Sequence, residues 1–134
     1  MTDQKLIRIA ALVGVGLAVP SMIYLLLLPQ PLYIEHLAIF LAAIAGVYLG
    51  FAAMDGRIRN MILETTVVAV FIALAIVGLK FSLLILAFAY FAHGVWDVFH
   101  HPKAIDTKIV AWYPPFCAMY DWSIAAFILV YFYL

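Results

Sequence analysis

Apolar residues fill five blocks along this chain, and short polar segments separate the blocks. The blocks cover about residues 9–28, 33–54, 61–79, 81–100 and 111–134. Each is predominantly apolar over roughly 20 residues, the length that an α-helix needs to cross the hydrocarbon core of a bilayer. The pattern therefore predicts an all-α fold, a polytopic membrane protein with a five-transmembrane-helix bundle in a single domain over residues 1–134.

The composition supports a membrane location and argues against some classes of function. Of the 134 residues, 69% are hydrophobic and 10% are charged, whereas about a quarter of the residues in a soluble domain are charged. Seven Lys and Arg residues balance seven Asp and Glu residues, so the charge indicates no nucleic-acid partner. We expect membrane lipid as the partner. The single cysteine, Cys117, excludes an internal disulfide bond.

The positions of the basic residues predict the orientation of the bundle. Lys80 lies between the third and fourth predicted helices. The other basic residues precede the first helix or lie in the second and fourth connections: Lys5, Arg8, Arg57, Arg59, Lys103 and Lys108. Because Lys and Arg concentrate in cytoplasmic loops, the N-terminus is predicted to be cytoplasmic and the C-terminus to be outside. We expect a multi-pass protein of the bacterial inner (plasma) membrane.

One stretch near the end of the fourth predicted helix contains three of the four histidines. Its sequence is His93-Gly94-Val95-Trp96-Asp97-Val98-Phe99-His100-His101. At about 100° per residue, its three histidines and its aspartate fall on one stripe of the helix. Ionisable groups in a membrane helix are costly unless they have partners, so this stripe indicates a functional site.

The predicted topology brings ionisable residues of the neighbouring helices to the same depth. Glu64 lies about one turn into the third helix, and Cys117 and Asp121 lie one turn apart on the fifth, which enters from the same side. The candidate catalytic residues are therefore His93, Asp97, His100 and Glu64. The candidate metal ligands are His93, Asp97, His100, His101, Asp121 and Glu64. Imidazole and carboxylate groups are usual ligands of zinc and non-haem iron, so the expected cofactor is zinc or iron, or otherwise none.

Several functions remain open for such a site, and the sequence alone does not decide whether the protein is an enzyme. A metal-dependent enzyme could activate water or oxygen toward a lipid or other apolar substrate. Without a metal, the same groups could form a proton-transfer or isomerase site. A proton or metal-ion transporter would need polar residues across the full thickness, yet the outer half offers only Glu35 and His36. A non-catalytic subunit of a membrane complex and a purely structural hydrogen-bond network are further interpretations.

Small residues on the second predicted helix indicate a face for close helix packing. Gly46-x-x-x-Gly50 lies among several alanines, and small residues at this spacing let helix backbones approach closely. Packing within the chain is the favoured interpretation, because small residues are common in membrane bundles. A homodimer through the Gly46/Gly50 face is the alternative.

The segment from His93 to Asp121 resembles an uncharacterised family of small bacterial integral-membrane proteins, a domain of unknown function. The matching features are His93-Gly94-x-Trp96-Asp97-x-x-His100-His101, then a proline-containing loop, then Cys117-x-x-x-Asp121, with a weaker match at Glu64. The resemblance spans roughly the C-terminal half of the chain. It implies that Glu64, His93, Asp97, His100, His101, Cys117 and Asp121 belong to one group, and it implies no particular reaction.

Overall fold

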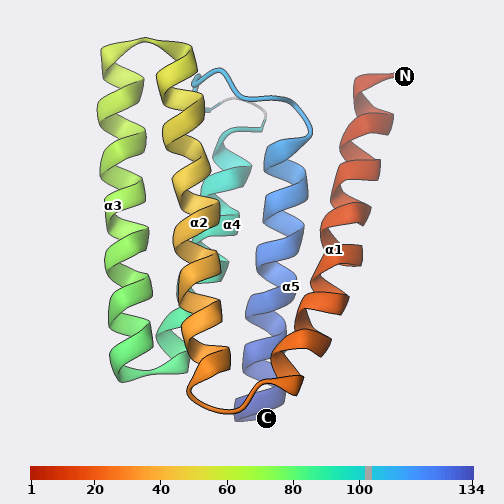
Figure 1. Ribbon diagram of the computed structural model, residues 1–134. Helices are drawn as coiled ribbons and strands as arrows, with labels where there is room; N and C mark the ends of the chain where they lie inside the picture. Colours follow the sequence, from red (N-terminus) through yellow and green to blue (C-terminus); the bar gives the residue numbers. More distant parts are fainter. Residues whose placement is uncertain (102–103) are drawn as a thin grey trace.

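Five α-helices form the computed structural model, which describes residues 1–101 and 104–134. They are α1 (Asp3–Leu27), α2 (Leu32–Asp55), α3 (Ile58–Phe81), α4 (Leu83–Phe99) and α5 (Tyr113–Tyr133). The helices run alternately in opposite directions (Figure 1), so the N-terminus, the α2–α3 turn and the α4–α5 loop lie at one end of the bundle. The described part of the chain contains no strand, and the prediction of an all-α fold is confirmed.

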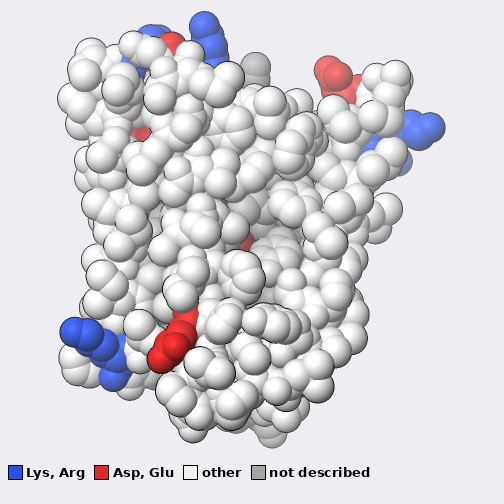
Figure 2. Space-filling model, in the orientation of Figure 1, with Lys and Arg blue, Asp and Glu red and all other residues white. Residues whose placement is uncertain are grey.

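The helices have the character of a membrane protein. Four of them, α1, α2, α3 and α5, are long and apolar enough to cross a membrane. The remaining helix, α4, has 17 residues and is about 25 Å long, slightly less than the ~30 Å of a hydrocarbon core. Figure 2 shows most of the charged side chains of this face at the two ends of the molecule, with a small acidic area near its middle. Five spans and the predicted orientation stay predictions, and Lys103, which contributes to the latter, lies outside the described residues.

Helix boundaries differ from the predicted ones where polar residues extend a helix. α1 begins at Asp3 instead of near residue 9, because the intervening polar residues are good helix formers and a carboxylate in the first turn favours the helix dipole. α3 begins at Ile58, directly after the turn at Gly56, whose φ of 75° ends α2. Ser82 alone separates α3 from α4 and accepts a hydrogen bond from the first turn of α4. Lys80, which is expected between the two helices, therefore lies in the last turn of α3.

Glycine permits close packing at a different place from the predicted one. α1 packs mainly on α5, and α5 also packs on α4. A Cβ atom at Gly14 of α1 would overlap the carbonyl oxygen of Phe116 on α5. By contrast, nothing lies within 4 Å of a Cβ atom added at Gly46 or Gly50. The interpretation that Gly46 and Gly50 pack closely within the chain is therefore wrong for the described residues. A homodimer through this face stays a prediction.

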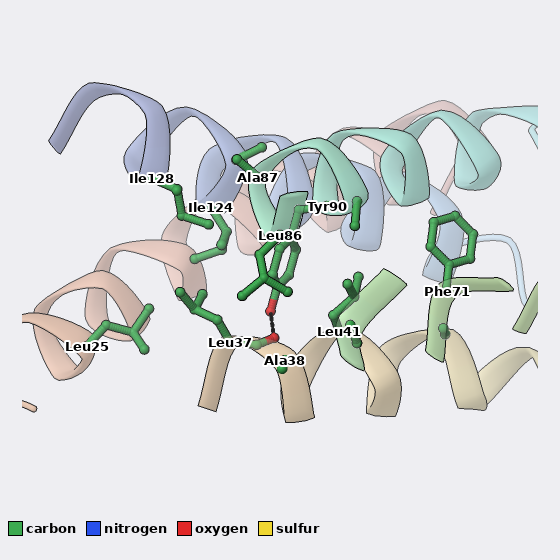
Figure 3. Close-up of a cluster of buried hydrophobic side chains, with 14 of the residues drawn as sticks. Leu25, Leu37, Ala38, Leu41, Phe71, Leu86, Ala87, Tyr90, Ile124 and Ile128 are labelled. Carbon is green, nitrogen blue, oxygen red and sulfur yellow. Dashed lines mark hydrogen bonds between the residues drawn. The ribbon is translucent and has the colours of Figure 1, made fainter. Parts of the chain in front are cut away.

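Aliphatic side chains fill the half of the bundle nearer the α3–α4 turn. Leu37, Leu86, Ile124 and Ile128 are each at most 1% exposed, and Figure 3 shows them gathered between α2, α4 and α5. Tyr90 lies in the same cluster, where its hydroxyl donates a hydrogen bond of 2.7 Å to the carbonyl oxygen of Leu37. The buried ionisable residues His93, Asp97 and Asp121 lie nearer the ends of α4 and α5 that the α4–α5 loop joins.

Candidate metal centre

Four buried residues that could ligate a metal ion meet between α4 and α5. His93 and Asp97 are one turn apart on α4, and Cys117 and Asp121 are one turn apart on α5, so each helix presents its pair on one face. With one ligand atom taken from each residue, all four atoms lie within 4.8 Å of one another. Each residue is at most 1% exposed. We call these four residues the α4–α5 group.

Hydrogen bonds orient the side chains of the α4–α5 group. His93 Nδ1 lies 2.7 Å from Asp121 Oδ2 and 3.5 Å from Asp97 Oδ2. Tyr48 of α2 donates a hydrogen bond from its hydroxyl to Asp97 Oδ1, and Cys117 Sγ donates to Asp121 Oδ2 at 3.7 Å. Three buried atoms of this group have no hydrogen-bond partner within the described chain: His93 Nε2, Asp97 Oδ2 and Asp121 Oδ1. The group thus retains nitrogen and oxygen atoms that are free to bind a metal ion.

The charge of the α4–α5 group suits a divalent cation. When ionised, Asp97 and Asp121 bring two negative charges beside one imidazole, and buried charge without compensation is costly. A divalent cation neutralises two carboxylates while His93 stays neutral, the form in which imidazole binds metals. Zinc and iron accept nitrogen, sulfur and carboxylate ligands together, whereas magnesium and calcium prefer oxygen alone. The residues therefore fit zinc or iron.

Glu64 and His100 form a second buried pair, between α3 and the end of α4. Their relative exposures are 0% and 5%. His100 Nε2 lies 2.8 Å from Glu64 Oε1, and the Thr107 hydroxyl donates to the same oxygen at 2.7 Å. The Tyr48 ring lies 4.8 Å from the His100 ring and 5.8 Å from the His93 ring, measured between centroids. Tyr48 therefore links the pair to the α4–α5 group.

The hydrogen bonds of His100 indicate that a hydrogen lies between His100 and Glu64. His100 Nδ1 lies 2.9 Å from the carbonyl oxygen of Trp96, and because a carbonyl only accepts, Nδ1 carries a hydrogen. A neutral imidazole with that hydrogen has a lone pair on Nε2, which would face a lone pair of an ionised Glu64. A second hydrogen must therefore lie between His100 Nε2 and Glu64 Oε1. The pair is electrically neutral as a whole, which suits its burial.

The candidate site residues divide into three sets in the structure. His93, Asp97 and Asp121 meet, and Cys117 joins them. Glu64 and His100 contact each other instead and lie outside this group of possible ligands. His101 is exposed at the end of α4.

Sequence reasoning missed two polar partners of the site, Tyr48 and Thr107. Tyr48 lies in the middle of an apolar helix and is 1% exposed. A buried tyrosine hydroxyl usually requires a partner, so this residue carried a usable signal. Thr107 is 4% exposed in the loop after α4, where no periodic pattern could place it beside Glu64.

Arg57 fastens the loop that brings Thr107 to Glu64. Its guanidinium donates to the Oδ2 and carbonyl oxygens of Asp106 at 2.7 Å and 2.6 Å. It also donates to both carboxylate oxygens of Asp55 at 2.8 Å and 2.9 Å. The hydrogen bond from Arg57 holds the pKa of the Asp106 carboxyl below its usual range. The neighbouring carboxylates raise the pKa of Arg57 above its usual range.

We expect acidification to loosen this loop. A carboxyl group with a lowered pKa in the folded state stabilises that state above its ordinary pKa, about 3.9. This stabilisation is lost as the pH falls through the lowered value. Protection factors for amide hydrogen exchange at residues 104–110 should therefore be lower at pH 3 than at pH 7. Asp106→Asn should show the lower protection already at pH 7, and unchanged protection in this variant would contradict the role of Arg57.

Comparison with known protein families identifies a relationship that covers nearly the whole chain. Residues 9–132 match the family described as "Family of unknown function (DUF6010)". The match extends from α1 to α5 and is wider than the C-terminal resemblance in the sequence. No curated protein and no solved structure matches the chain. On the strength of the family match, this protein belongs to DUF6010, a family of unknown function.

Proposed function

We propose that this protein is a small membrane-embedded enzyme with a divalent metal centre that acts on a lipid or another apolar substrate. His93, Asp97 and Asp121 would hold zinc or iron as three protein ligands, and Cys117 lies beside them. The observation that carries the proposal is the α4–α5 group itself. Its four possible ligands lie within 4.8 Å of one another, and three of its buried donor atoms have no partner in the described chain.

The residues around the α4–α5 group favour catalysis over a purely structural site. Catalytic zinc sites commonly have three protein ligands and one open position, and the metal supplies Lewis acidity toward water or a substrate oxygen. The Glu64–His100 pair lies outside the ligand group and holds a transferable proton, as a general acid–base group does. Tyr48 donates to Asp97 and contacts the His100 ring, so it connects the two groups.

Metal-free proton transfer is the second candidate function. The Glu64–His100 pair favours it, because the pair holds its proton without a metal. Transport is less well supported, since a conducting path needs polar groups through the full thickness. Beyond the α4–α5 group, the described interior is filled by residues such as Leu37, Leu86 and Ile124.

Elemental analysis of detergent-purified protein tests the metal centre. After loading with zinc or iron, we expect roughly one bound metal per chain in the wild type and at least about tenfold less in His93→Ala. His36→Ala is the matched histidine control and should keep its metal, because His36 lies near the opposite end, where Nδ1 contacts the Leu32 carbonyl oxygen at 2.8 Å. A wild type that stays metal-free would exclude the metal-dependent enzyme and leave metal-free proton transfer.

A further inference from the structure

Two hollows adjoin along the groove between α4 and α5. The larger has a volume of about 800 Å³, and its lining includes Leu84, Phe88, Phe91, Ala126 and Leu129. The smaller has a volume of about 250 Å³, and its lining includes Ala11 of α1 together with Asp97, His101, Pro114 and Ala118. Trp122 lines both hollows. We call them the chain hollow and the head hollow.

The chemistry of the chain hollow matches a hydrocarbon chain. Its described lining consists of apolar side chains, and the one polar atom among them, Trp122 Nε1, donates to the carbonyl oxygen of Phe91 at 3.2 Å. Phe88 is 64% exposed and Leu129 is 40% exposed, so the hollow opens on the surface of a bundle with the character of a membrane protein. Its volume lies within the ~300–1,000 Å³ of typical ligand pockets.

The head hollow adjoins one residue of the α4–α5 group. Asp97 forms part of its wall, and the buried Oδ2 atom of this residue has no hydrogen-bond partner within the described chain. His101 at the end of α4 and Pro114 at the start of α5 place this hollow at the end of the bundle that holds the α4–α5 loop. A polar head group in this hollow would lie beside Asp97 and His101, and an attached chain would extend along α4 and α5 toward the chain hollow.

Gly94 determines how closely Trp122 approaches α4 where the two hollows meet. A Cβ atom at residue 94 would lie 2.6 Å from Cδ1 of Trp122, which is too close for two carbon atoms. The indole therefore lies in the space that only glycine leaves at this position. Trp122 therefore lies against α4 where the two hollows meet, and it lines both of them.

We propose that this protein binds a single-chain amphiphile, with its acyl chain in the chain hollow and its polar head in the head hollow beside Asp97 and His101. This assignment of a substrate class rests on the proposed function, because it places the head group next to the candidate metal centre. The two hollows share Trp122 and follow the same pair of helices, which is why we infer one chain. The resulting orientation is that of a lipid in the leaflet nearer the α4–α5 loop.

Photolabelling by two fatty acids tests this proposal on the full chain in phosphatidylcholine vesicles. One probe carries a diazirine next to its carboxyl group, and the other carries it near its methyl end. The first should label residues 97–101 and 114–119, the second should label 84–91 and 122–129, and excess oleate should suppress both. Labelling that is independent of the probe, spread over all helices and unaffected by oleate would overturn the proposal.

A matched pair of variants tests the chain hollow separately. Ala126→Trp places an indole in this hollow, whereas Ala73→Trp places one on the exposed surface of α3. We expect labelling by the methyl-end probe to fall about tenfold in Ala126→Trp, through lost binding free energy, and to stay at the wild-type level in Ala73→Trp. Equal labelling of the two variants would overturn the assignment. If Ala126→Trp does not fold, the difference between the residues that the two probes label in the wild type still tests the proposal.

Metal content measured on the same samples separates this inference from the proposed function. A metal-free wild type that is labelled at the two hollows with the expected dependence would support the amphiphile site and contradict the metal centre alone. A metal-loaded wild type with unspecific labelling would contradict the amphiphile site alone.

Discussion

Replacing Asp97 by asparagine should abolish the stabilisation of this protein by zinc. A ligand that binds only the folded state at 100 times its Kd stabilises that state by about 2.7 kcal/mol. Asparagine keeps the shape of Asp97 but has no negative charge, so we expect zinc to stabilise the folded state of the variant hardly at all. Thermal unfolding in detergent, with a chelator and then with excess zinc, measures this difference directly.

Without metal, the same experiment should show the opposite order of stability, with Asp97→Asn no less stable than the wild type. Without metal, the Asp97 and Asp121 carboxylates both face His93 Nδ1, at 3.5 Å and 2.7 Å. Removing one of two like charges should leave Asp97→Asn at least as stable as the chelated wild type. Asp3→Asn, an exposed carboxylate of α1, is the control and should keep the full response to zinc. An equal response in Asp97→Asn would contradict ligation by this residue.

Hydropathy is sufficient to predict the five helices but not where they end. Apolar blocks must become helices in lipid, because no water is present there to satisfy their backbone groups. Their ends depend on local interactions that hydropathy does not measure. The carboxylate of Asp3 extends α1 beyond its apolar residues, and the φ of 75° at Gly56 ends α2.

The pairs within each helix were predictable, whereas the contacts between helices were only partly so. Spacing by four residues places His93 and Asp97 on one face of α4, and helix order places them at the depth of Asp121. Neither argument gives the rotation of α3, which directs Glu64 to His100 and away from the α4–α5 group. The position of Thr107 depends on the loop that Arg57 fastens, and hydrophobic periodicity carries no information about such a loop.

Substitutions at Glu64 should have very unequal effects on stability. Glu64→Ala leaves His100 Nε2 and the Thr107 hydroxyl buried without their partner, and breaking a buried pair in this way costs about 3–5 kcal/mol. Both contacts are made to Glu64 Oε1. In Glu64→Gln an amide NH2 in that position retains them, because it donates one hydrogen to the lone pair of His100 Nε2 and the other to the hydroxyl oxygen of Thr107. We expect it to cost less than about 1.5 kcal/mol. Equilibrium unfolding of both variants in detergent provides the comparison.

The glutamine variant also separates the structural role of the Glu64–His100 pair from its proposed chemical role. It resembles the neutral pair in shape and hydrogen bonding but has no carboxyl proton to transfer, so it should stay folded and lose proton-transfer activity. Its metal content should equal that of the wild type, since Glu64 lies outside the α4–α5 group. Loss of metal would contradict the division of the site into two groups. Destabilisation as large as that of Glu64→Ala would show that the fold requires an ionised Glu64, because glutamine supplies every contact except the charge.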